Sequence, residues 1–264
     1  MKSFRFLQMG LLVCATAAHA QETGVWKTAY VKRGFVGNYD ANWVGGTGAT
    51  LRMRVPMPFA GTKARVYVKG CFDAETELAK MTLVKGVDDL GKITGPNYPV
   101  LFRGEPTLKL EKGLKEMISD EVTVPVSQGI WYVQDRYTST KYPYAYEVDK
   151  EFYAPGEKFD EETLPKGVAA RLGIVTRIDV FTTDPRPIIL CYGDSITHGY
   201  SSTPNPGRRY PDVLGRLLNR PTLNLGVNGD TVSQSVALPH IATQLKGVDT
   251  VVFLMGINDI INSK

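Results

Sequence analysis

Hydrophobic and polar residues alternate in short runs along the first two thirds of the chain. Clusters of glycine, proline and aspartate separate these runs. A period of two places every second side chain on the same face of a β-strand, so each run is typical of a strand with one buried face. The pattern predicts a jelly-roll-like β-sandwich over residues 22–185. The clearest runs are residues 50–55, 63–69, 107–110, 122–126 and 177–181.

One segment, residues 137–165, departs from this alternation. It is rich in aromatic residues and ends in an acidic, proline-bearing stretch. Such rings can stack against a sugar or an acyl group, or they can hold a long loop on its own domain. We favour packing within the domain. The aromatic residues concerned are Tyr142, Tyr144, Tyr146, Phe152 and Tyr153.

The pattern changes after residues 182–187, which we interpret as a domain boundary. Apolar runs at 187–192, 222–225 and 249–255 predict three strands. Between them lie two helical stretches, of which the second, 231–245, is disturbed at Pro239. Such alternation predicts parallel strands with right-handed crossovers, in a three-layer flavodoxin-like α/β fold over residues 186–264. The first helix has an apolar stripe of Tyr210, Val213, Leu214, Leu217 and Leu218.

A polar motif follows each of the three predicted strands. Open α/β sheets bind their ligands at the carboxyl ends of the strands, so the three motifs are expected to meet there. Alone, Ser195 would be interpreted as a helix cap and Asn258 as a turn former. Three such motifs in succession favour a catalytic site. They are Gly193-Asp194-Ser195, Asn224-Leu225-Gly226-Val227-Asn228-Gly229 and Gly256-Ile257-Asn258-Asp259.

Together these motifs resemble those of the SGNH (GDSL) serine hydrolases, in the order in which that family carries them. The resemblance extends through residues 201–203 and 209–214. It also takes in the β-rich leader, because some secreted members carry a sandwich domain ahead of the hydrolase domain. An α/β-hydrolase elbow, Gly-x-Ser-x-Gly, is absent because Thr197 occupies the position of its last glycine.

The resemblance implies a role for each motif. Ser195 would be the nucleophile that forms an acyl-enzyme with a carboxylic ester. The oxyanion hole would consist of the backbone N–H groups of Ser195 and Gly226 and the side-chain amide of Asn258. We expect Asp194 and Asp259 to support their turns through side-chain-to-backbone hydrogen bonds. No metal and no organic cofactor is implied.

The family's general base is missing from the sequence. The resemblance implies an Asp-x-x-His pair in a late loop, but neither His198 nor His240 has an aspartate three residues earlier. His198 lies one helical turn after the nucleophile, where its side chain points along the helix, so it is a weak candidate for the base. We therefore expect a C-terminally truncated chain whose Asp/His pair lies beyond Lys264. The last strand would then be an exposed edge.

The N-terminus is typical of a secretory signal peptide. Lys2 and Arg5 precede a short apolar run, and Ala18-His19-Ala20 predicts cleavage after Ala20. The protein is thus expected to be secreted or periplasmic, and the run is too short to span a membrane. The net charge is only +4, without a basic cluster, so nucleic acid is not an expected partner. Export would permit a disulfide between Cys71 and Cys191, but we favour a buried free thiol at Cys191.

The sequence therefore predicts a secreted serine ester hydrolase. The substrate implied by the resemblance is O-acetylated carbohydrate, with a lipid or lysophospholipid ester as the alternative. A different class of protein is a catalytically dead glycan-binding protein, in which the sandwich binds glycan. A third hypothesis is an acyltransferase that uses the same serine.

Overall fold

A computed structural model describes residues 23–32, 37–40, 48–113, 115–144, 150–169, 173–202 and 207–262. The predicted signal peptide, residues 1–20, and Tyr146 lie outside the described residues. No helix in the described ranges is long and apolar enough to cross a membrane.

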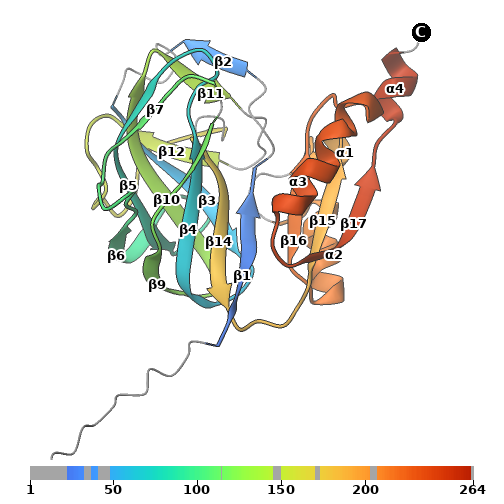
Figure 1. Cartoon of the computed structure of the whole chain (residues 1–264), viewed down its shortest axis with the longest axis horizontal. Coiled ribbons are helices and arrows are strands. Elements are labelled where there is room, and N and C mark those ends of the chain that lie inside the picture. The colour runs from blue at the N-terminus through green and yellow to red at the C-terminus, as the bar shows by residue number, and fades with distance from the viewer. Residues whose placement is uncertain are drawn as a thin grey trace, which may run out of the picture.

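Two antiparallel sheets form the first part of the molecule (Figure 1). One sheet has the order β1 (Val25–Val31), β14 (Val175–Thr182), β4 (Gly61–Lys69) and β8 (Glu116–Ile118), with β9 (Val122–Val126) also paired to β4. The other has the order β13 (Lys166–Ala169), β12 (Lys150–Ala154), β3 (Thr50–Met57), β10 (Gly129–Ser139), β5 (Thr76–Gly86) and β6 (Ile93–Pro99). In this second sheet β7 (Leu108–Leu110) pairs with β5, and a separate ribbon joins β2 (Gly37–Asp40) to β11 (Lys141–Tyr144).

The two sheets bury their alternating apolar residues against one another. Val55 and Val133 from one sheet belong to the same buried cluster as Val66 and Val180 from the other. This is the packing that a period of two predicts, with one face of each strand in the core. The description as jelly-roll-like stays a prediction.

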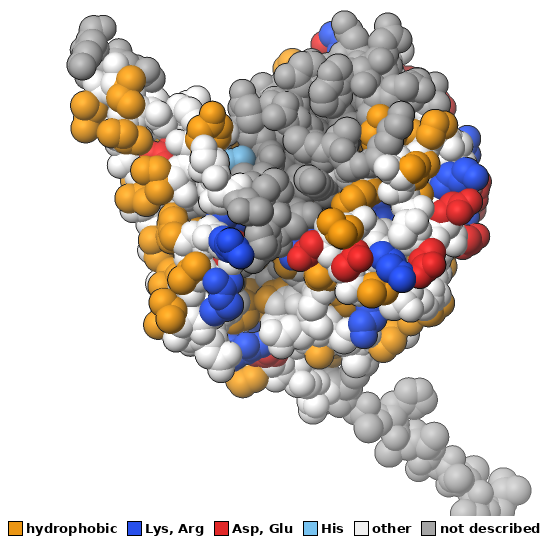
Figure 2. Space-filling model, turned by 180° about the vertical axis from the view of Figure 1, so that it is seen from behind, with side chains coloured by type: hydrophobic (Ala, Val, Ile, Leu, Met, Phe, Trp, Pro, Cys, Tyr) orange, Lys and Arg blue, Asp and Glu red, His pale blue; other side chains and the backbone are white. Residues whose placement is uncertain are grey.

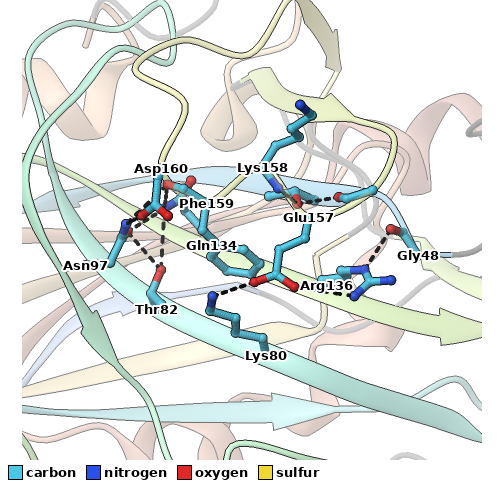
Figure 3. A network of polar contacts seen from close by, with 12 residues as sticks. Gly48, Lys80, Thr82, Asn97, Gln134, Arg136, Glu157, Lys158, Phe159 and Asp160 are labelled. Atoms are coloured by element: carbon cyan, nitrogen blue, oxygen red, sulfur yellow. Dashed lines mark hydrogen bonds and ion pairs between the residues drawn. The ribbon is translucent and has the colours of Figure 1, made fainter.

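A loop after β12 covers the outer face of the second sheet (Figure 3). The side-chain amide of Gln134 donates to Asn97 Oδ1 at 2.7 Å and to the carbonyl of Phe159 at 3.0 Å. Lys80 pairs with Glu157 at 2.7 Å. The ring of Phe159 is buried, and Phe152 packs in a second apolar cluster. The interpretation that aromatic residues hold this segment on its own domain is therefore confirmed for Phe152, whereas the side chains of Tyr142 and Tyr144 lie outside the described residues.

Three parallel strands form the second part, in the order β16 (Thr222–Gly226), β15 (Ile188–Gly193) and β17 (Val248–Leu254). The change from antiparallel to parallel pairing thus falls between Thr182 and Ile188. Pro239 is the second residue of α3, where the 3₁₀ turn η2 gives way to the helix, so the predicted disturbance lies there. The helices are α1 (Ser195–His198), α2 (Tyr210–Leu218), η2 (Val232–Ala237), α3 (Leu238–Gln244) and α4 (Ile257–Asn262).

Strand–helix alternation is thus confirmed, but the burial it predicted is only partial. Leu217 and Leu218 were expected in a buried stripe, yet they are 78% and 54% exposed at the end of α2. Val251 and Phe253 are about half exposed as well. In the described part of the chain, β17 pairs with β15 alone and forms the edge of its sheet. The predicted strand is present.

The two parts share one apolar core and a polar junction. Ile188 and Leu190 of β15 belong to the same buried cluster as the sandwich residues. The Lys27 ammonium donates to the carbonyl of Arg186 at 2.9 Å. Arg186 in turn donates to the carbonyl of Pro58 at 3.1 Å and to Asp184 at 2.6 Å. Residues of the sandwich and of the segment that leads into β15 therefore both contribute hydrogen bonds to the junction.

We expect Asp184→Asn to destabilise this junction. Hydrogen bonds from Arg186 lower the pKa of the Asp184 carboxyl. A lowered pKa in the folded state means that the ionised group stabilises the fold above its unfolded pKa of about 3.9, and that this contribution is lost as the pH falls through the folded pKa. The variant should lower the free energy of unfolding at pH 7 by about 1–2 kcal/mol, with a smaller difference at pH 3.

Urea unfolding at both pH values measures this effect. Asp73→Asn is the matched control, because Asp73 is exposed and its ion pair with Lys141 lies at the surface, where such pairs contribute little to stability. If Asp184→Asn is as stable as Asp73→Asn at pH 7, the Asp184 carboxylate does not stabilise the junction and the prediction is wrong.

Candidate active site

Ser195 lies directly after the central strand of the parallel sheet. Gly193, at the end of β15, is in register with Gly226 of β16 and with Leu254 of β17. The carboxyl ends of all three strands therefore lie side by side, and the segments that follow them start from the same edge. Ser195 is the first residue of α1 and is partly exposed.

Asp194 supplies the cap of α1. Its carboxylate accepts a hydrogen bond of 2.9 Å from the N–H of Ile196. This corrects the alternative in which Ser195 itself caps the helix, because that role is already taken. The helix ends after one turn at Gly199, whose φ of 92° favours glycine. The turn therefore presents a serine whose hydroxyl is not required to cap its own helix.

Close packing of backbone requires glycine at two strand ends. A Cβ atom at Gly193 would overlap Thr197 Oγ1 and the carbonyl of Leu254. One at Gly226 would overlap the backbone of Thr197 and His198. Both overlaps involve α1, so neither position has room for a side chain. The helix that carries Ser195 thus rests directly on the ends of β15 and β16.

The N–H of Gly226, an expected oxyanion donor, makes a hydrogen bond within the protein. It donates to the side-chain oxygen of Asn224 at 2.9 Å. The amide nitrogen of Asn224 donates in turn to the carbonyl of Thr197 at 2.8 Å. The N–H of Gly226 is therefore engaged within the protein, and the residue is glycine because α1 packs against it. This differs from the expected reason, close approach of a substrate oxygen.

The third segment instead meets the second at Gly229 and Asp230. Asn258 donates from its side-chain amide to the carbonyl of Asp230 at 2.7 Å. Gly229, the preceding residue, has a φ of 81°, and a Cβ there would meet no atom within 4 Å. Gly229 therefore lies in an open turn beside Asn258. The Asn228-Gly229 dipeptide, a strong turn signal, could have pointed to it in the sequence.

Asp259 ties the same two segments together. Its carboxylate oxygens accept from the N–H of Val232 at 3.0 and 3.1 Å. Asp259 thus makes a side-chain-to-backbone hydrogen bond, but with a segment distant in sequence and not within its own turn. The start of α4 is held against η2 as a result.

Near α1, the side chains of Tyr210 and Cys191 are neutral at pH 7. Thr197 Oγ1 lies 3.1 Å from the hydroxyl of Tyr210, whose pKa is raised by burial. Burial raises the pKa of the Cys191 thiol to about 11, so the thiol is protonated at neutral pH. Cys71 is also a buried free thiol. The interpretation of Cys191 as a buried free cysteine is confirmed, and no disulfide joins it to Cys71.

The two histidines of the described ranges, His198 and His240, occupy different environments. His198, the last residue of α1, is buried at the place where its backbone touches Gly226. His240 lies exposed on α3, with its Nε2 atom 2.7 Å from Gln244 Nε2. His240 therefore interacts with its own helix at the surface.

Comparison with known families finds a match in the C-terminal segment. The model of the GDSL-like lipase/acylhydrolase family matches residues 191–264, which contain all three motifs. No curated protein sequence matches the chain.

Solved structures give looser likenesses. The chain is 25% identical to AlinE4, an SGNH-hydrolase family esterase, over 31% of this chain and 46% of that one, with a TM-score of 0.28. It is 15% identical to a family two carbohydrate esterase from Clostridium thermocellum, over 81% and 60% of the chains, with a TM-score of 0.25. For the acetyl xylan esterase Est2A from Butyrivibrio proteoclasticus the identity is 9%, over 90% and 65%, with a TM-score of 0.26.

The chain covers less than two thirds of each of these three structures. The family match, in contrast, falls on the segment that contains Ser195, Asn258 and the turns after the three parallel strands. Residues 191–264 are therefore similar to the GDSL-like lipase/acylhydrolase family.

Proposed function

We propose that this protein hydrolyses carboxylic esters through an acyl-serine intermediate. The observation that carries the proposal is the convergence of three segments at one sheet edge, with Ser195 after the central strand and Asn258 after its neighbour. Such an edge is where open α/β sheets bind their ligands. No resident cofactor is part of the proposal.

The reaction starts with attack of Ser195 Oγ on the carbonyl carbon of the ester. A bond forms between Oγ and this carbon, and the electron pair of the carbonyl double bond moves to its oxygen. Collapse of this tetrahedral species expels the alcohol, and water later releases the acid from the serine. The proton that leaves Ser195 passes to a general base and then to the departing alcohol. His198, buried at the end of the same helix, is the described residue to test as that base.

The oxyanion is stabilised by donors from all three segments. We assign these donors to the N–H of Ser195, the N–H of Gly229 and the side-chain amide of Asn258. Gly229 replaces Gly226 in this assignment because the N–H of Gly226 already donates to Asn224. The amide of Asn258 has two N–H bonds and uses one for Asp230, so one remains for substrate.

The proposed substrate is an O-acetylated carbohydrate, and a lipid or lysophospholipid ester is the alternative. Ile196 and Tyr200, which flank the site on α1 and the turn after it, are 55% and 69% exposed. An exposed aromatic ring and an exposed aliphatic side chain offer a surface to a ligand that approaches Ser195. With the N-terminal segment interpreted as a signal peptide, the enzyme would work outside the cytoplasm.

Replacement of Ser195 by alanine should abolish serine-dependent ester hydrolysis. Loss of a catalytic serine lowers turnover by about 10³-fold or more, because no acyl-enzyme can form. Hydrolysis of p-nitrophenyl acetate across pH, with thermal unfolding to verify the fold, measures this. Ser127→Ala is the control, since Ser127 lies next to β10 in the sandwich. Equal turnover by Ser195→Ala and the parent protein would refute the nucleophile assignment.

The same pair of proteins separates the rival functions. Retention of glycan by parent and Ser195→Ala alike, without ester turnover, would favour a glycan-binding protein. Acyl transfer to an added sugar would favour an acyltransferase.

Asn258→Ala should reduce kcat, whereas Asn224→Ala should reduce stability. Loss of one oxyanion donor lowers kcat by about 10²–10³-fold. Asn224 bridges Gly226 to Thr197 within the fold, so its loss should lower the free energy of unfolding by about 1–3 kcal/mol. Steady-state kinetics and urea unfolding of both variants test the distinction. A kcat of Asn258→Ala within twofold of the parent would exclude Asn258 from the oxyanion hole.

A further inference from the structure

A cleft of about 470 Å³ lies between the two parts of the molecule. One wall consists of β1 and β3 of the sandwich, and the other of α2 and the start of β16. Seen from behind, basic side chains lie along the side of the second part that is turned toward the sandwich (Figure 2). The volume falls in the range of small-molecule sites, roughly 300–1,000 Å³.

The charges that line this cleft are strongly unbalanced. Asp212 is the only carboxylate among the described lining residues. The two walls of the cleft thus bring positive charge into one concave space, where charge of one sign attracts an oppositely charged ligand. The positive lining residues are Arg54, Arg186, Arg209, Arg216 and Arg220.

Several of these arginines have carboxylate partners outside the lining. Arg54 pairs with Asp89 at 2.5 Å and Arg220 pairs with Asp249. Asp89 and Asp249 are absent from the described lining of the cleft. Because a guanidinium has five N–H donors, one such pair leaves donors for a ligand.

Arg216 differs from the other four. It donates to the backbone carbonyl of Gly207, and among the described residues it has no carboxylate partner. It is exposed on α2. Its charge is therefore not compensated by a salt bridge within the described fold, and it is the arginine that an anionic ligand would neutralise.

Two of the other arginines are held in place by backbone. Arg186 donates to the carbonyl of Pro58 at 3.1 Å, and Arg220 donates to the carbonyl of Pro187 at 3.1 Å. Side chains that are already ordered lose less entropy when a ligand binds. This part of the cleft is thus preorganised.

One end of the cleft approaches the helix that carries Ser195. A Cβ at Gly199 would overlap the side chain of Arg209, so this lining arginine packs against the turn that ends α1. The hydroxyl of Tyr210, at the start of α2, lies 3.1 Å from Thr197 Oγ1. The other end lies at Asn219 and Arg220, after α2. The cleft therefore follows α2 toward α1.

We propose that this cleft binds the carboxylate of an acidic saccharide, with Arg216 as its principal ligand-binding arginine. Guanidinium groups recognise carboxylates through paired, charge-assisted hydrogen bonds. The anionic part of the assignment follows from the lining charges alone. The saccharide part rests on the proposed carbohydrate esterase function, for which a uronate-bearing chain is the matching class of substrate.

Isothermal titration of the full chain with trigalacturonic acid tests this proposal. Xylotriose is the neutral arm and inorganic phosphate is the free-anion arm. All titrations use the Ser195→Ala variant, so that the saccharide is not hydrolysed during the measurement. The binding result therefore does not depend on whether the protein is an esterase. We expect trigalacturonic acid to bind more tightly than either comparison ligand, with an affinity that falls as salt is added.

Arg216→Gln should weaken binding of trigalacturonic acid by about tenfold. Arg216→Lys should weaken it by less, because lysine keeps the positive charge but cannot make the two parallel hydrogen bonds of a guanidinium group. Arg103→Gln, an exposed arginine of the sandwich outside the cleft, is the matched control and should change nothing. Thermal unfolding verifies the fold of each variant. Equal affinity of Arg216→Gln and Arg103→Gln would overturn the proposal. So would absence of binding, or phosphate binding as tightly as the saccharide.

Discussion

Direct contact between α1 and the ends of two parallel strands is the constraint on which the site depends. Gly193 and Gly226 have no room for a side chain, because the backbone and Thr197 of α1 occupy that space. The contact fixes where the chain turns after β15, and hence where Ser195 stands. Asp194 caps this turn with its own carboxylate. The serine therefore takes its position from backbone packing, and its hydroxyl is left for chemistry.

Around this contact the molecule forms a continuous structure. Apolar residues of β15 belong to the sandwich core, and Arg186 and Lys27 make polar contacts across the junction. The sandwich therefore forms one wall of the cleft beside α2. Its place in the architecture agrees with the proposed contribution to ligand binding beside α2.

Much of the fold follows from local sequence patterns, because alternation and helical periodicity report which face of an element is buried. The three motifs were likewise predictable, since each follows an apolar strand. Patterns could not choose between Gly226 and Gly229, because both are glycines in one segment. The choice depends on a tertiary hydrogen bond from Gly226 to Asn224 and on the contact of Asn258 with Asp230. Helical periodicity could not reveal that Leu217 and Leu218 are exposed. Their burial depends on which other segments of the chain pack against α2, and the sequence of α2 alone does not determine this. The arginine cleft combines residues distant in sequence and carries no local signal.

The most direct test of the central claim, that Ser195 is the nucleophile at the edge of this sheet, is covalent labelling. The folded protein is treated with a fluorophosphonate, which reacts with activated serines, and the modified peptide is located by mass spectrometry. We expect one adduct, on Ser195, that forms in the native protein and not after denaturation. An adduct on another serine, or no adduct on the native protein, would contradict this claim.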